Sequence, residues 1–225
     1  LGPAFPRGVL LVFGIASLAL AAIYLLQQRN IKRLLAYSSI EHMGVLAIGI
    51  GLGAPLAAAG VLLHVIAHSA AKGNAFLGAG VLVQKYRTKD MSRIRSALTA
   101  LPVSAPLFLF SILTLSAVPP FAMFRSEFQI VAGGMMAAHG WPTSILVVLV
   151  TVAFVGLSVQ TTRMMFAHPS TATATATVPT PGEPSRWMVA GMVVGMVVLL
   201  VLGVHPPAAL VQMFRAGAAA LVGAS

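Results

Sequence analysis

The sequence predicts an all-α protein, a polytopic bundle of about seven transmembrane helices, and three observations lead to this prediction. Of the 225 residues, 58% are hydrophobic and 8% are charged, whereas a soluble domain carries about 25% charged residues. Most apolar runs are long enough to cross a hydrocarbon core of about 30 Å. The basic residues gather in two short segments, 29–33 and 85–95, which is typical of loops held in the cytoplasm.

We expect the helices to lie within one transmembrane domain over residues 1–225. The expected spans are residues 8–27, 34–53, 57–84, 103–118, 121–138, 144–166 and 187–204. A discontinuous helix is expected near Pro119–Pro120, because two prolines remove two backbone donors. Residues 167–186, rich in Thr, Ala and Pro, predict a flexible loop, and residues 208–222 predict a helix lying at the membrane surface.

Charge and composition exclude several classes of function. The net charge of +10 does not indicate a nucleic-acid partner, because the charge lies mainly in two loops between apolar runs and fits anionic lipid headgroups. The absence of cysteine excludes disulfides, thiolate metal sites and a cysteine nucleophile. No phosphate-binding glycine loop, nucleophile constellation or haem motif stands out in the sequence.

Three ionisable residues four apart, His64, His68 and Lys72, lie in a strongly apolar run. On a helix they share one face and form a ladder of about 12 Å, at roughly 6 Å per step. A charge near the bilayer centre costs at least about 2.5 kcal/mol, so such groups are typical of proton or ion passage. Neutral histidine donates from one ring nitrogen and accepts at the other, which suits a proton relay.

Two other interpretations of this ladder stay open. The histidines could only hydrogen-bond within the bundle while Lys72 extends toward the headgroups. Alternatively, His64 and His68 could bind zinc, which is disfavoured because this span supplies no carboxylate.

Two acids also fall in apolar surroundings. Glu127 follows the proline break, where a helix restarting at Phe121 would present free amides to a carboxylate; it is a candidate switchable acid at a discontinuous helix. The alternative is neutralisation by an arginine, although Arg125 is two residues away and faces elsewhere. Glu41 and His42 are adjacent and so point in different directions, and either could equally support a neighbouring site group or hydrogen-bond within the bundle.

Three motifs together resemble one known family. The run from Lys32 to Gly44, KRLLAYSSIEHMG, resembles the start of a core helix in antiporter-like subunits of respiratory complex I, membrane-bound [NiFe] hydrogenases and multisubunit cation/proton antiporters. Its SSIEHMG part looks most like hydrogenase-4 component F. The His64–Lys72 ladder is similar to the family's histidine–lysine helix, and the stretch from Pro119 to Phe128 is similar to its broken helix.

The resemblance implies a proton-translocating membrane subunit, without a cofactor of its own, in a bacterial-type inner membrane. Its implied partners are other membrane subunits and a hydrophilic [NiFe] or flavin/iron–sulfur arm, as in NADH dehydrogenase- or hydrogenase-type complexes. The resemblance also implies residues for a proton pathway. Lys72 and Glu127 would be its central groups and His64 and His68 its relays, and the pathway would also include Glu41 and Lys32.

The family has two inverted helix repeats, and this chain would supply only the second, the C-terminal half. The glutamate and lysine of the first half-channel would therefore lie outside it. Two rival functions stay open: a component of a gradient-driven cation/proton antiporter, and a non-conducting assembly scaffold.

Overall fold

Helices make up the whole of the described secondary structure. The computed structural model describes residue 2, residues 4–167 and residues 179–223. Over this part of the chain the helices are α1 (Ala4–Gln27), α2 (Ile31–Gly51), α3 (Pro55–Tyr86), the 3-10 turn η1 (Met91–Arg93), α4 (Ala97–Ala100), α5 (Ser104–Leu115), α6 (Ala122–Met136), α7 (Gly140–Phe166), α8 (Arg186–Val204) and α9 (Ala208–Val222). The described residues contain no strand, only an isolated bridge between Asn30 and Asp90. The all-α prediction is therefore confirmed.

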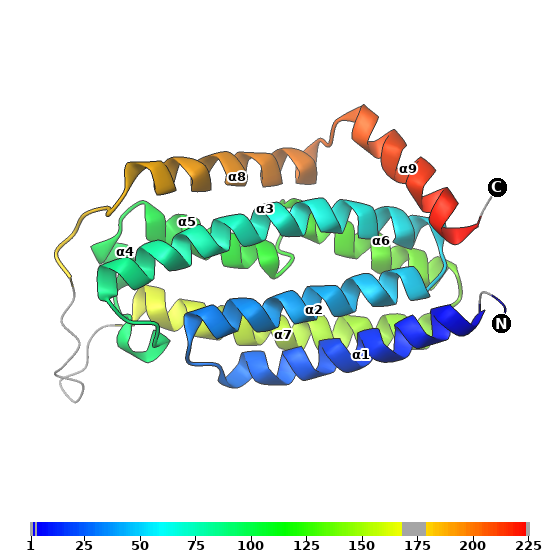
Figure 1. The fold of residues 1–225 in the computed structure, drawn as a ribbon, viewed down its shortest axis with the longest axis horizontal. Helices are drawn as coiled ribbons and strands as arrows, with labels where there is room; N and C mark the ends of the chain where they lie inside the picture. The colour runs from blue at the N-terminus through cyan, green and yellow to red at the C-terminus, as the bar shows by residue number, and fades with distance from the viewer. Residues whose placement is uncertain (1, 3, 168–178, 224–225) are drawn as a thin grey trace.

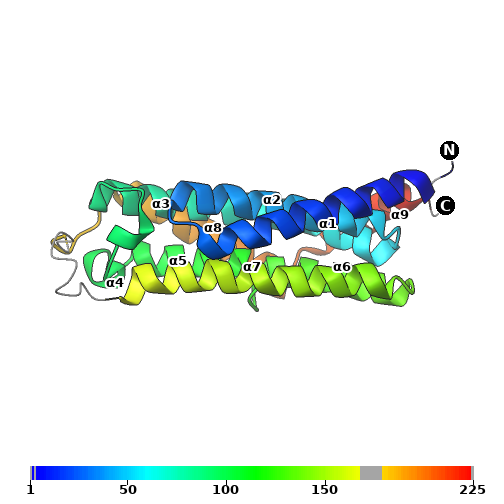
Figure 2. The ribbon, with the colours of Figure 1, turned by 90° about the horizontal axis from the view of Figure 1, so that it is seen from below.

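The long helices lie side by side along one axis and form an elongated bundle (Figures 1 and 2). Helix α3 is central and packs against α2, α5, α6, α8 and α9, whereas α1 packs against α2 and α7. Five helices, α1, α2, α3, α7 and α8, are long and apolar enough to cross a membrane. They correspond to five of the seven predicted spans.

The other two predicted spans, 103–118 and 121–138, form the short helices α5 and α6. These have 12 and 15 residues, which at 1.5 Å per residue is about 18 and 23 Å, less than the roughly 30 Å of hydrocarbon. The two helices lie end to end beside α3 (Figures 1 and 2). Residues 116–121, with a cis Pro119–Pro120 bond, separate them. The predicted break is confirmed, whereas two separate full-length helices here are not observed.

The two basic loops meet at one end of the bundle. The Ile31 amide donates to the Lys89 carbonyl (3.0 Å), and the Met91 amide donates to the Arg29 carbonyl (2.8 Å). Next to this contact Asn30 caps α2, because its side chain accepts hydrogen bonds from the backbone amides of Lys32 and Arg33. The prediction that both basic loops lie on the same side is thus confirmed.

Helix α8 passes directly over the break between α5 and α6. A Cβ placed on Gly203 would lie 2.1 Å from the Pro120 carbonyl oxygen and 2.6 Å from the Phe121 carbonyl carbon. Asn74 of α3 holds the same helix, since its side-chain amide donates to the Met192 carbonyl (3.0 Å). Glycine therefore permits the close approach that fixes α8 against the broken helix.

The predicted loop at 167–186 falls largely on residues 168–178, which lie outside the described residues. Its final part is attached to the bundle. The Glu183 carboxylate accepts hydrogen bonds from the backbone amides of Val103 and Ser104 at the start of α5 and from the Ser104 hydroxyl. Residues 208–222 form the helix α9, which packs against α3; that this helix lies at the membrane surface stays a prediction.

Candidate functional site

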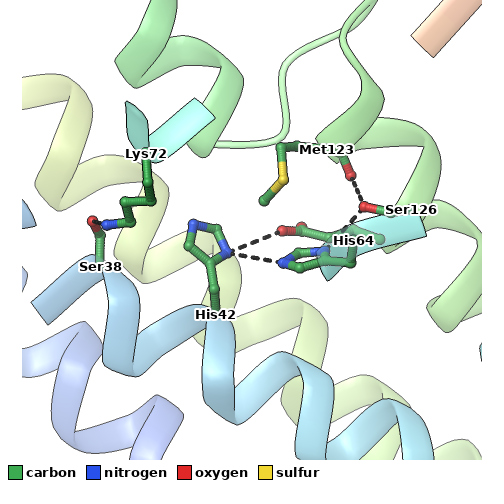
Figure 3. A network of polar contacts seen from close by, with 7 residues as sticks. Ser38, His42, His64, Lys72, Met123 and Ser126 are labelled. Atoms are coloured by element: carbon green, nitrogen blue, oxygen red, sulfur yellow. Dashed lines mark hydrogen bonds and ion pairs between the residues drawn. The ribbon is translucent and has the colours of Figure 1, made fainter. Parts of the chain in front are cut away.

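Helices α2 and α3 turn their ionisable side chains toward each other in the middle of the bundle. Helical spacing places Ser38 and His42 on one face of α2, and His64 and Lys72 of the predicted ladder lie on the facing side of α3 (Figure 3). Glu41, His42 and His64 are almost completely buried, Lys72 is 7% exposed and Glu127 is 9% exposed. The site is therefore a cluster of ionisable groups withdrawn from the surface of the bundle.

Lys72 is held by α2. Its ammonium group donates to the Leu35 carbonyl (2.6 Å) and to the Ser38 hydroxyl (2.5 Å) (Figure 3). The interpretation in which Lys72 extends toward the headgroups is therefore not observed. A lysine anchored in this way presents its charge to the interface between α2 and α3.

The histidines continue the cluster toward the broken helix. His42 Nδ1 lies 3.3 Å from His64 Nε2, and His64 Nδ1 lies 3.0 Å from Ser126 Oγ on α6. The Ser126 hydroxyl donates to the Met123 carbonyl (2.7 Å), so its oxygen is left to accept from His64. This assigns the His64 proton to Nδ1, and His42 then donates from Nδ1 to His64 Nε2.

His68 completes a group of three rings. Its ring centroid lies 4.8 Å from that of His42 in an edge-on arrangement and 6.2 Å from that of His64. His68 Nδ1 and His42 Nε2 are buried nitrogens that no hydrogen-bonding group among the described residues contacts. Three histidines from two helices thus lie close together, and two of their ring nitrogens have no hydrogen-bonding partner among the described residues.

Glu127 approaches the histidines from α6. Its Oε1 lies 3.9 Å from His42 Nδ1 and makes no hydrogen bond within the described chain. Because α6 begins five residues earlier, at Ala122, the expected contact with free amides at the helix start is not observed among the described residues. Arg125 points elsewhere and donates to the Gly203 carbonyl (3.3 Å).

A cavity of about 280 Å³ adjoins this carboxylate. Its lining is largely apolar and comes from α2, α6 and α7, with residues of the break at one side; it includes Val45, Ser116, Glu127, Val131 and Leu146. Glu127 is the one ionisable residue of that lining, so the cavity offers a route to the buried acid from the side of the bundle.

The two remaining residues predicted for the proton path, Glu41 and Lys32, have different surroundings. Glu41 is 2% exposed, and its Oε2 contacts no hydrogen-bonding group of the described residues. Lys32 is exposed in the first turn of α2, and its backbone amide donates to Asn30. Nine residues separate it from Glu41, about 13 Å along the helix, so the structure does not bring Lys32 into the cluster.

The prediction did not include His42 among the site residues, although it lies between the histidines of α3 and Glu127. A signal was present in the sequence: Ser38 and His42 are four apart, as are His64 and His68. Two polar stripes of equal spacing on consecutive apolar helices indicate a shared interface.

The arrangement suits proton transfer through side chains. One direct contact joins two imidazoles, one joins an imidazole to a hydroxyl, and the longer separations are of the size that a water molecule bridges. Together these features define a polytopic membrane protein with a buried row of ionisable groups beside a discontinuous helix.

Comparison with known proteins places the chain in a family. Residues 5–156 match the family described as NADH:quinone oxidoreductase/Mrp antiporter, TM. The chain belongs to this family, and it is accordingly a multi-pass membrane protein. The resemblance predicted from the sequence is confirmed.

Named relatives come from several kinds of complex. The chain is 29% identical over 207 residues to a hydrogenase-4 component F homolog of Methylacidiphilum infernorum, covering 92% of this chain and 41% of that protein. It is 34% identical over 213 residues to NADH-quinone oxidoreductase subunit N 2 of Roseiflexus castenholzii, covering 90% and 41%. A protein of Rhizobium meliloti, named as a component of a probable K(+)/H(+) antiporter, is 30% identical over 200 residues, covering 86% and 19%. The chain thus spans at most about two fifths of the length of these relatives.

Solved structures share the fold. A chain of respiratory complex I from Thermus thermophilus superposes with a TM-score of 0.84 at 25% identity, covering 98% of this chain and 45% of that one. A chain of the Mrp complex from Dietzia superposes with a TM-score of 0.86 at 17% identity, covering 97% and 48%. The second likeness shows the fold alone.

Proposed function

We propose that this chain is a proton-translocating membrane subunit of a redox-driven complex of the complex I or [NiFe]-hydrogenase type, in a bacterial inner membrane. The observation that carries the proposal is the largely buried cluster between α2, α3 and α6, which holds Lys72, three histidines and Glu127. Ionisable groups are costly inside a membrane, and those retained there typically serve ion or proton movement. The family, and the names of the relatives, support the same class of function.

The histidine contacts give the path a defined chemistry. A proton arriving at the unpartnered Nε2 of His42 allows the Nδ1 proton of His42 to pass to His64 Nε2. His64 then passes its own Nδ1 proton to Ser126 Oγ, while the serine hydroxyl turns from the Met123 carbonyl and gives its own proton to a bridging water. Each histidine gains one proton and loses another, so the relay stays neutral once the proton has passed.

Lys72 and Glu127 stand at the two sides of this relay and are proposed to exchange charge through it. Lys72 is anchored to Leu35 and Ser38, so its proton can leave without the side chain reorienting. Glu127 lies close to His42 and borders the lateral cavity. Glu41 is proposed as a further buried acid of the path, and Lys32 as a group at the end of α2 where protons would enter or leave.

Electron transfer would occur in partner subunits, and no cofactor is proposed in this chain. The implied partners are other membrane subunits and a hydrophilic [NiFe] or flavin/iron–sulfur arm. Because the chain spans at most about two fifths of its named relatives, a second half-channel supplied by additional helices belongs to this proposal.

One alternative has specific support. The likeness to the K(+)/H(+) antiporter component favours a component of a gradient-driven cation/proton antiporter. Such a component would need no redox partner. A non-conducting assembly scaffold is the remaining outcome.

The proposal is tested by isolating the native membrane complex through an affinity tag on this chain. We expect [NiFe] or flavin/iron–sulfur subunits to co-purify, and electron donors to drive proton movement in reconstituted vesicles. Sodium or potassium exchange against protons, without any redox subunit, would establish the antiporter instead. If transport persists after combined neutralisation of His68, Lys72 and Glu127, the chain is a scaffold.

A further inference from the structure

We propose that His42, His64 and His68, together with Glu127, bind a divalent cation of the zinc class, and that the bound ion blocks the proton path. The binding site is inferred from geometry alone, whereas the block rests on the function proposed above. Within the described chain these three histidines form a group whose ligand atoms all lie within 4.8 Å of one another.

The first argument is the spacing of the nitrogens. Two nitrogen ligands at 2.0–2.1 Å from a tetrahedral zinc ion lie about 3.3–3.4 Å apart. His42 Nδ1 and His64 Nε2 are 3.3 Å apart, so this pair already has the separation of two zinc ligands. The ligand atoms lie within 4.8 Å of one another, so His68 must approach by up to about 1.4 Å to join the other two. His68 is only half-buried, and its Nδ1 makes no competing hydrogen bond in the described chain.

The second argument is the hydrogen bond that orients the His64 ring. Histidines that bind zinc almost always donate their other ring N–H to an acceptor, which directs the free lone pair at the metal. His64 has this arrangement, since its Nδ1 faces Ser126 Oγ at 3.0 Å and that hydroxyl donates to the Met123 carbonyl. Its Nε2 is thereby held toward His42.

The third argument is charge. An isolated divalent ion among neutral imidazoles in an apolar bundle would be strongly disfavoured. Glu127 Oε1 lies 3.9 Å from His42 Nδ1 and is otherwise unpartnered among the described residues. It supplies the carboxylate that α3 itself lacks, and the donor set becomes three nitrogens and one oxygen. This set favours zinc, cobalt or nickel over magnesium and calcium, which prefer all-oxygen sites.

Occupation of the site would stop the relay. A metal bound at His42 Nδ1 and His64 Nε2 replaces the contact through which the proton passes. It also occupies the carboxylate proposed to exchange charge with Lys72.

The test uses the purified native complex and two probes, Zn²⁺ alone and Co²⁺ alone. We expect bound Co²⁺ to show the intense visible absorption of a four-coordinate site, and Zn²⁺ to displace it. His68→Gln and His64→Gln should each lose one equivalent of tightly bound Zn²⁺ per chain. Ser126→Ala should keep the ligands but weaken Zn²⁺ binding by about 10- to 100-fold.

Surface histidines provide the matched control, because His139 and His205 are both exposed. His139→Gln and His205→Gln should bind Co²⁺ as the unmodified complex does. His68→Gln is the variant least disruptive to folding, since this side chain is half-buried. An absorption spectrum and Zn²⁺ stoichiometry unchanged in both His68→Gln and His64→Gln would overturn the site.

Inhibition is measured separately from binding. We expect Zn²⁺ to stop proton transport at the concentration that fills the site. If Zn²⁺ binds and transport continues unaffected, the blocking role is wrong although the site exists. If the complex binds Zn²⁺ but moves no protons even without the metal, the proposed function fails and the metal site stands.

Discussion

His64 and Ser126 face each other between α3 and α6, with His64 Nδ1 3.0 Å from Ser126 Oγ. The Ser126 proton is committed to the Met123 carbonyl at 2.7 Å, so the serine oxygen can only accept. One backbone carbonyl near the start of α6 therefore decides which nitrogen of His64 carries the proton. Through His64 it also decides the direction of the contact with His42.

Replacing Ser126 by alanine tests this relationship. The change leaves the buried N–H of His64 without an acceptor, which costs about 1–3 kcal/mol of stability, and it frees the ring to adopt the other tautomer. We expect proton transport in reconstituted vesicles to slow several-fold without being abolished. Ser69→Ala is the matched control, because the exposed Ser69 hydroxyl bonds only to a carbonyl of its own helix. Equal transport rates for the two variants would contradict the account.

His42 and His64 are expected to act as one unit. Glutamine in place of either ring keeps a hydrogen-bonding side chain but cannot take up a proton at one atom while releasing one at another. His42→Gln and His64→Gln should therefore each reduce transport severely, and the double variant should be little worse than either. The measurement is a double-mutant cycle on the transport rate. Fully multiplicative losses would show that the two histidines act independently.

Gly203→Ala should loosen α8 from the broken helix. The new Cβ would lie 2.1 Å from the Pro120 carbonyl oxygen, and because the obstructing atoms are backbone they cannot simply rotate away. We expect destabilisation of about 1–3 kcal/mol, seen as a lower thermal unfolding midpoint in detergent. Gly8→Ala is the control, since no atom lies within 4 Å of a Cβ there, and it should be neutral or slightly stabilising. Equal midpoints for both variants would refute the close packing.

Glu183 should make stability depend on acid pH. Burial would raise the pKa of Glu183, but hydrogen bonds from Ser104 and Val103 and the charge of Lys85 outweigh burial and lower the pKa below its ordinary value. A carboxyl whose pKa is lower folded than unfolded stabilises the protein above the unfolded value, about 4.3 for glutamate, and loses this contribution as pH falls through the folded pKa.

Glu183→Gln should therefore lower the unfolding midpoint at neutral pH, and its difference from the unmodified chain should shrink as the pH falls below the unfolded value. Thermal unfolding followed over this range measures the difference. A difference that stays constant with pH would show that the carboxylate charge is not what anchors this segment.

Much of the fold follows from the sequence because apolar length and proline position act locally. The five long helices, the break at Pro119–Pro120 and the position of both basic loops on one side were all predictable on this basis. The number of long helices was overestimated, since hydropathy does not show that the two runs beside the prolines form short helices placed end to end.

The site was predictable one helix at a time. The ladder on α3 was found from its spacing, but the role of α2 was not, because contacts between helices depend on how they rotate against each other. This is why His42 was missed; Lys32, which was included through the family resemblance, lies exposed at the start of α2. The partner of Glu127 was likewise not predictable, since it lies on another helix.

The central claim is that Lys72 and Glu127 carry protons through this chain, and proton translocation by the reconstituted complex tests it most directly. Lys72→Ala and Glu127→Gln should each abolish translocation while the complex still assembles with its full set of subunits. Lys89→Ala, which removes an exposed lysine, should translocate normally. Normal translocation in both Lys72→Ala and Glu127→Gln would contradict the account.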